Sequence, residues 1–155
     1  MNHSLRKGIK LLGKCLFLLY MTALVYFLFL SEDFGHGGTG EYSYNIIPFR
    51  EILRYIRYRE VLGTRAVLMN LVGNVLGFLP FGALVPLMAR GARRAWRTML
   101  LSFEVSALVE LSQLIFQVGC FDVDDMILNT LGGLLGYLLF RLTSSLYEWA
   151  ETRAA

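Results

Sequence analysis

Carboxyl and amide side chains recur at helical spacing inside long apolar stretches of this chain. In residues 98–118 the polar side chains share one helical face: Ser102, Ser106, Glu110, Gln113 and Gln117. At 100° per residue these positions fall within about 80° of one another. A carboxylate at the centre of a membrane helix costs about 2.5–3.5 kcal/mol, so we expect this face to contact protein or water. We therefore expect Glu110 to be protonated or hydrogen-bonded to an amide.

Two further apolar stretches carry polar faces of the same kind. Asn70 and Asn74 share a face in residues 66–89, and Asp125 and Asn129 share one at the start of the last stretch. These amides are either ligand-binding groups or interhelical hydrogen bonds, which contribute about 0.6 kcal/mol each. Small residues at four-residue spacing let helices approach closely. The glycines expected at helix contacts are Gly73, Gly77, Gly132 and Gly136.

Three aspartates, Asp122, Asp124 and Asp125, precede the last apolar stretch. Oxygen ligands of this kind suit Mg²⁺ beside a phosphate. The same residues also suit a helix N-terminus, where they would cap free N–H groups and interact with the helix dipole. Both interpretations stay open. Glu104 lies on a different face from Glu110, near a basic loop, and we expect it to pair with Arg97 or a neighbouring basic residue.

The lengths of the apolar stretches predict helices that cross a membrane. The chain has 155 residues, 55% of them hydrophobic and 17% charged, and its mean hydropathy is +0.51. Crossing the hydrocarbon layer takes about 20 apolar residues. We expect an all-α polytopic membrane protein with one membrane domain, residues 11–142. The four predicted transmembrane helices are residues 11–30, 66–89, 98–118 and 126–142.

The flanking charges predict the orientation. Arg6, Lys7, Lys10 and Lys14 lie at the start of the first span, and Arg90, Arg93, Arg94 and Arg97 lie between the second and third. The positive-inside rule places these segments in the cytoplasm, together with the N-terminal segment 1–10 and the C-terminal tail 143–155. Cys15 and Cys120 then lie on opposite sides, so no disulfide is expected. The modest net charge of +3, concentrated at span ends, argues against nucleic-acid binding.

The first outer loop contains a short amphipathic segment. Phe49, Ile52, Leu53 and Ile56 recur at helical spacing within residues 49–62, which predicts a short helix in the outer membrane interface. Counting about 1.5 Å per residue from the span ends, the polar residues described above converge in the outer half of the bundle. We therefore expect a polar pocket that opens outward or into the outer leaflet.

Four segments in a fixed order resemble the VanZ-like family. They are NIIPFR (Asn45–Arg50), NLVGNVLGFLPFG (Asn70–Gly82), Glu110 with Gln113, and FDVDDMILNTLGG (Phe121–Gly133). The resemblance covers about residues 45–140. The matching motif residues are Asn45, Pro48, Phe49, Arg50, Asn70, Gly73, Asn74, Pro80, Gly82, Glu110, Gln113, Asp122, Asp125, Asn129 and Gly132. Some relatives place a basic residue just before the acidic segment, where this chain has Gly119 and Cys120, so Arg50 is a candidate substitute.

The resemblance implies a small multi-pass protein of the bacterial inner membrane. The founding members of the family are associated with low-level resistance to teicoplanin-type glycopeptides, although membership does not establish resistance here. The first hypothesis is a non-enzymatic protein whose outward pocket binds a lipid headgroup, a lipid-linked cell-wall precursor or a lipophilic glycopeptide, with no cofactor. The predicted ligand-binding residues are Arg50, Asn70, Asn74, Glu110, Gln113, Asp122, Asp125 and Asn129.

Two other activities remain as alternatives, beside a role as a scaffold or helper for a larger complex. The first is a Mg²⁺-dependent enzyme acting on a membrane phospholipid or polyprenyl phosphate, with the metal at Asp122, Asp124 and Asp125. No zinc motif, phosphate loop or nucleophile–base spacing supports it. The second is ion or proton translocation through Glu110, for which four spans are few unless the protein forms a homo-oligomer.

Overall fold

The computed structural model describes residues 3–30 and 43–154, and within them the chain is almost entirely helical. Two three-residue strands are the exception. In chain order the elements are α1 His3–Leu30, β1 Ser43–Asn45, α2 Arg50–Arg57, α3 Arg59–Leu62, α4 Thr64–Val67, η2 Leu68–Val72, α5 Gly73–Met88, η3 Arg90–Ala92, α6 Ala95–Phe116, β2 Cys120–Asp122 and α7 Val123–Ala154.

Three helical stretches are long and apolar enough to cross a membrane: Thr64–Met88, Ala95–Phe116 and Val123–Arg153. The first joins α4, the π-helical turn η2 and α5 into one helix. In α1 the described apolar part, Leu11–Tyr26, is shorter. The prediction of an all-α membrane protein is therefore confirmed. The helices agree with the predicted second and third spans to within a few residues.

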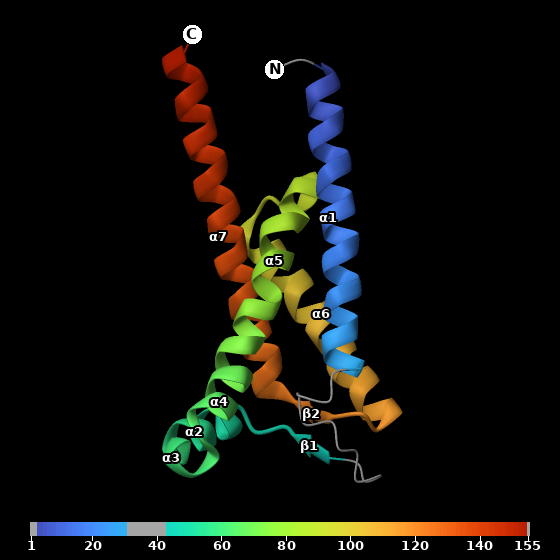
Figure 1. Ribbon diagram of the computed structural model, residues 1–155, viewed down its shortest axis with the longest axis vertical. Helices are drawn as coiled ribbons and strands as arrows, with labels where there is room; N and C mark the ends of the chain where they lie inside the picture. The colour runs from blue at the N-terminus through green and yellow to red at the C-terminus, as the bar shows by residue number, and fades with distance from the viewer. Residues whose placement is uncertain (1–2, 31–42, 155) are drawn as a thin grey trace.

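Helix α7 continues well beyond the predicted end of the last span. The apolar run weakens after residue 142, yet the helix extends to Ala154 because the following residues include good helix formers and no glycine or proline. The described part of the predicted tail 143–155 is thus a continuation of α7. In Figure 1 the start of α1 and the end of α7 lie at one end of the molecule, and α2, α3 and both strands lie at the other.

The centre of the bundle is packed with aromatic side chains. Phe78 and Phe81 of α5 are buried, and their ring centroids lie 6.0 Å apart. The ring centroids of Phe17 in α1 and Phe81 lie 6.0 Å apart. The Tyr20 hydroxyl donates a hydrogen bond to the Gly77 carbonyl at 2.8 Å. Helix α1 is therefore attached to α5 by ring packing and by a polar contact.

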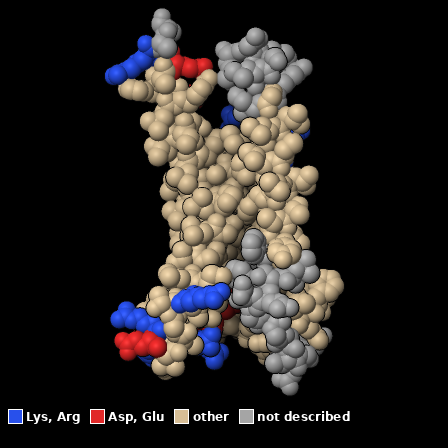
Figure 2. Space-filling view, viewed as in Figure 1, with Lys and Arg blue, Asp and Glu red and all other residues tan. Residues whose placement is uncertain are grey.

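One face of the molecule has few charged side chains in its middle. In the face shown in Figure 2, the coloured Lys, Arg, Asp and Glu side chains gather at the two ends, and the broad band between them holds other residues. Such a band is what a protein needs in contact with hydrocarbon.

Glycines on α7 let the backbones of α5 and α7 meet. A Cβ at Gly132 would overlap the Val75 carbonyl oxygen, and one at Gly136 would overlap that of Leu79. Gly82, singled out in the sequence only as a motif residue, lies equally close to the Gly133 carbonyl. Gly77 differs, because a Cβ there would have no neighbour within 4 Å. Its carbonyl contacts α1, but its Cα does not lie against another helix.

The strands pair in parallel although the paired residues are 77 positions apart in the sequence. Ser43, Tyr44 and Asn45 lie opposite Cys120, Phe121 and Asp122. The pair joins the segment that precedes α2 to the turn between α6 and α7 (Figure 1). It places Asn45 directly beside the acidic segment at the start of α7.

We expect Gly136→Ala to destabilise the protein and Gly77→Ala to leave it nearly unchanged. The first methyl must displace the backbone of α5, at a cost of about 1–3 kcal/mol or more. The second points into open space, where the change is about 1 kcal/mol or less. Heating each detergent-purified variant and measuring the remaining monodisperse fraction compares them. Equal losses at both positions would contradict this description of the α5–α7 contact.

Candidate functional site

Asp122 and Asp124 cap the N-termini of two different helices. Asp122 Oδ1 accepts from the backbone N–H of Asp124 at 2.8 Å and from Asn45 Nδ2 at 2.9 Å, so it caps α7 and holds β1. Asp124 is 1% exposed. Its carboxylate accepts from the backbone N–H groups of Phe49, Glu51 and Ile52, the latter two at 2.7 and 3.1 Å. Capping by Asp122 was one of the two interpretations left open, whereas capping of α2 by Asp124 was not foreseen.

The predicted helix over residues 49–62 is two short helices, α2 and α3, that meet at Tyr58. Phe49 precedes α2 with a left-handed backbone, φ 66°, which is uncommon for a residue with a side chain. The hydrogen bonds to Asp124 hold the first turn of α2 in this position.

Glu110 is buried, at 2% exposure, and its Oε2 accepts from the backbone N–H of Asp122 at 2.9 Å. Hydrogen bonding to an amide was one of the two states expected for this carboxyl. The contact links the end of α6 to β2. Because the same Asp122 residue also caps α7, a single short turn connects both helices through side-chain hydrogen bonds.

The three asparagines each connect two elements. Asn74 Nδ2 donates to Asp125 Oδ1 at 2.6 Å, between α5 and α7. Asn129 Nδ2 donates to Ser106 Oγ at 2.8 Å, between α7 and α6. Asn70 lies in the π-helical turn and donates to the Tyr55 hydroxyl of α2 at 2.8 Å. These amides thus form the hydrogen bonds between elements that were one of the two interpretations. However, not every polar atom of the three side chains has a hydrogen-bond partner.

One acceptor in this network stays unused. Asn129 is 2% exposed, and its Oδ1 is the single buried side-chain N or O atom within the described residues that has no hydrogen-bond partner. Leaving a buried polar atom unsatisfied costs about 1–3 kcal/mol. Such a group points to a ligand or a water molecule as its missing partner.

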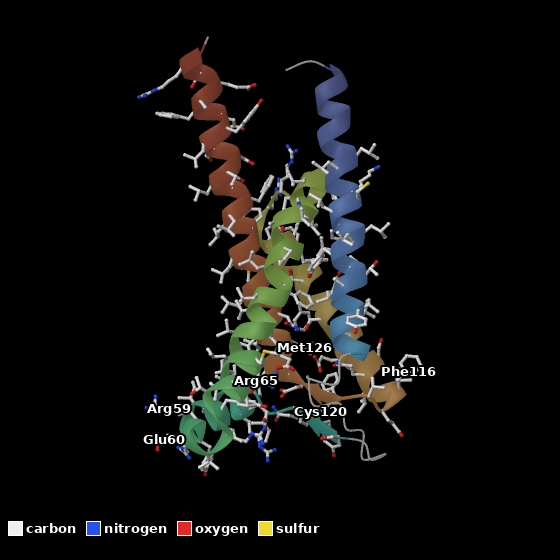
Figure 3. All side chains as sticks on the ribbon, in the orientation of Figure 1. Arg59, Glu60, Arg65, Phe116, Cys120 and Met126 are labelled. Carbon is white, nitrogen blue, oxygen red and sulfur yellow. The ribbon has the colours of Figure 1, made fainter. Side chains whose placement is uncertain are left out.

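The carboxyl and amide side chains of this hydrogen-bond network, apart from Asp124, border a cavity of about 450 Å³ at the end of the bundle where α2 and the strands lie. All eight predicted ligand-binding residues line it: Arg50, Asn70, Asn74, Glu110, Gln113, Asp122, Asp125 and Asn129. The cavity also contains side chains that sequence reasoning did not select as ligand-binding, such as Asn45, Glu51, Arg54 and Tyr55. In Figure 3 the labelled Cys120, another lining residue, marks this end of the molecule.

The charges lining the cavity are unequal. Four carboxyl groups, of Glu51, Glu110, Asp122 and Asp125, face two guanidinium groups, of Arg50 and Arg54. Arg54 Nη2 contacts Glu51 Oε2 at 2.5 Å. Burial raises the pKa of Asp122, and hydrogen bonds from Asn45 and the Asp124 backbone act in the opposite direction. Burial also raises the pKa of Tyr55.

The three aspartates do not converge on one point. Across residues 3–30 and 43–154, no three His, Cys, Asp or Glu side chains gather as a metal site. Asp124 is occupied at α2 and is absent from the cavity lining. The Mg²⁺ arrangement considered for Asp122, Asp124 and Asp125 therefore lacks its middle ligand.

The predicted pair between Glu104 and Arg97 does not form among the described contacts. Arg97 Nη1 donates to the Gly91 carbonyl at 3.0 Å, and its guanidinium lies over the Trp96 ring at 5.2 Å. Glu104 is exposed on the surface of α6, away from the cavity lining. Helical spacing correctly separated its face from that of Glu110, but the local loop carbonyl is the better partner for Arg97.

Comparison with known proteins places the cavity inside a recognised domain. A family model described as VanZ/LLP1 matches residues 17–144, which include every residue that lines the cavity. Protein VanZ of Enterococcus faecium is 28% identical over 140 residues, covering 87% of this chain and 77% of that protein. No solved structure matches the chain.

We expect Asp124→Ala to release α2 from the bundle. The change removes the acceptor of three backbone N–H groups, and loss of a helix cap costs about 0.5–2 kcal/mol. Hydrogen–deuterium exchange should rise in residues 49–57 and much less in α6. Glu60→Ala, an exposed change on α3, serves as the control. Unchanged protection of α2 in the Asp124 variant would show that the helix is held by other contacts.

Proposed function

The chain belongs to the VanZ/LLP1 family, and from this premise we propose that its cavity binds a lipid headgroup or a lipid-linked envelope component at the outer face of the bacterial inner membrane. Through that binding the protein affects susceptibility to teicoplanin-type glycopeptides. The observation that carries the proposal is the shared cavity, in which buried and half-buried carboxyl and amide groups from α5, α6 and α7 meet and Asn129 Oδ1 lacks a partner.

The proposal includes a four-span topology with both termini in the cytoplasm. Helix α1 is 28 residues long and packs along α5, which supports it as the first span. Arg93, Arg94 and Arg97 lie in and after the α5–α6 connection, at the end opposite the cavity. The positive-inside rule assigns that end to the cytoplasm and the cavity to the outer surface.

The surroundings of the cavity support an amphiphilic ligand. Ile46, Ile47, Phe49, Leu53 and Ile56 are large apolar side chains near α2, and all of them are exposed. Exposed apolar side chains beside basic ones are typical of segments that lie in the membrane interface. We propose that α2 and α3 lie there, so that acyl chains contact this apolar surface while a polar headgroup enters the cavity.

The topology predicts different labelling of two cysteine positions in intact cells. In a Cys15→Ser background, Cys120 is exposed beside the cavity and should react with a membrane-impermeant maleimide. Burial raises the pKa of its thiol, so labelling should be slow at neutral pH and faster as the pH rises. A Ser145→Cys variant lacking both native cysteines should react only after permeabilisation. Reaction of Ser145→Cys in intact cells, with Cys120 protected, would reverse the proposed orientation.

The binding role predicts which substitutions abolish a resistance phenotype. The chain should raise the teicoplanin concentration that inhibits a susceptible Gram-positive host. Glu110→Ala and Asn74→Leu should remove this effect because each deletes a polar group of the cavity. Glu104→Ala, a change of the same type on the lipid-facing side of α6, should retain it. Membrane levels of each tagged variant are measured in parallel, and equal loss at positions 104 and 110 would contradict the role of the cavity.

A further inference from the structure

The inner part of the cavity is rich in carboxyl groups that form no ion pair with the described residues. The hydrogen bonds that these carboxyls accept come from amide groups: Glu110 accepts from the Asp122 N–H, Asp122 from Asn45 Nδ2 and the Asp124 N–H, and Asp125 from Asn74 Nδ2. Among the residues that line the cavity, Arg54 forms an ion pair with Glu51. Neutral amide donors compensate a buried carboxylate less than a cation does. This part of the cavity therefore favours a positively charged group that can donate hydrogen bonds.

Asn129 adds a second, independent sign of the same preference. Its Nδ2 is used by Ser106, so its free atom is the carbonyl-type Oδ1, which can only accept. A ligand atom that satisfies it must carry N–H or O–H groups. This unpartnered acceptor lines the same cavity as the carboxyls of Glu110, Asp122 and Asp125.

The arginines of the cavity lie on its more exposed side. Arg50 and Arg54 are four residues apart on α2, and so share one face of that helix. The Arg54 side chain is 49% exposed, in contrast to 2% for Glu110. A guanidinium is suited to phosphate, which it can bind through two hydrogen bonds. The cavity thus offers cationic groups near its mouth and anionic groups in its interior.

From this order of charges we propose that the cavity recognises an aminoalkyl phosphate, such as the headgroup of phosphatidylethanolamine. Its primary ammonium lies inside, among Glu110, Asp125 and Asn129, and its phosphate lies at the mouth with Arg50 and Arg54. This inference rests on the proposed function and specifies the ligand class of the same cavity. A lipid fits the order of groups, because its amine is the distal end of the headgroup and its acyl chains stay outside.

The arrangement predicts selectivity among lipid headgroups. Phosphatidylglycerol carries the phosphate but no cation, so it leaves the interior carboxyls uncompensated. Phosphatidylcholine carries a cation without N–H donors, so it leaves Asn129 Oδ1 unsatisfied. Each loss is comparable to that of a charge-assisted hydrogen bond, and we expect either lipid to bind about tenfold or more weakly than phosphatidylethanolamine.

Native mass spectrometry of the purified, delipidated full chain tests this directly. The protein is titrated with phosphatidylethanolamine, phosphatidylglycerol and phosphatidylcholine that have identical acyl chains, and the bound fractions are compared. Soluble phosphoethanolamine and glycerol phosphate are then added as competitors. We expect preference for the ethanolamine lipid and displacement by phosphoethanolamine at lower concentration than by glycerol phosphate. Tighter binding of phosphoethanolamine than of the lipid would keep the ligand class and assign a soluble source.

Matched variants separate charge from folding. Glu110→Gln with Asp125→Asn keeps oxygen acceptors for the Asp122 N–H and for Asn74 while it removes both negative charges. This variant should lose the preference for ethanolamine lipid without losing phosphatidylglycerol binding. Arg50→Gln with Arg54→Gln should weaken both lipids. Glu104→Gln, outside the cavity, should behave as the unmodified chain does.

The outcomes distinguish this inference from the function on which it rests. Equal binding of the three lipids, or a preference that survives Glu110→Gln with Asp125→Asn, would overturn recognition of the ammonium while leaving a lipid-binding cavity. Binding of none of the lipids or soluble compounds by the unmodified chain would overturn both the ligand class and the proposed binding of lipid headgroups.

Discussion

Carboxylates at the start of α7 must find hydrogen-bond donors, and the donors they find determine how this end of the molecule is built. Asp124 accepts hydrogen bonds from free N–H groups at the start of α2, and Asp122 accepts from the Asp124 N–H of α7 and from the Asn45 amide. Close to a bilayer, a carboxylate or a backbone N–H group that loses its contact with water must gain another hydrogen-bond partner. The acidic turn therefore fixes the loop segment 45–52 against the bundle.

That attachment creates the cavity and its asymmetry. Once Asp124 holds the first turn of α2, Arg50 and Arg54 border a space whose other walls come from α5, α6 and α7. Glu110 and Asn129 are buried within those helices, whereas the arginines belong to a short surface helix. The helices meet closely enough for this because Gly132 and Gly136 let α7 lie against the α5 backbone. Packing and polar contacts thus support the same arrangement.

The sequence allowed the helices and most of the site to be predicted, since both follow from helical periodicity. The face of Glu110 and Gln113, and those of Asn74 and Asn129, were predictable because a membrane helix must turn such groups inward. The β1–β2 pair was not, because three-residue strands 77 positions apart leave no periodic signal. The capping of α2 by Asp124 could not be predicted for a related reason: its donors lie in α2, and only the tertiary structure brings them near. Gly77 fits the small-residue spacing, yet that spacing alone does not show which side of the helix meets α7.

An experimental structure of the protein in a bilayer containing phosphatidylethanolamine tests the central claim most directly. It should show the Asp124 carboxylate at the N-terminus of α2, with Glu110, Asn74 and Asn129 around one space that holds a headgroup. The amine should lie deeper than the phosphate. A structure in which these side chains point toward separate surroundings, with α2 detached from α7, would contradict the account.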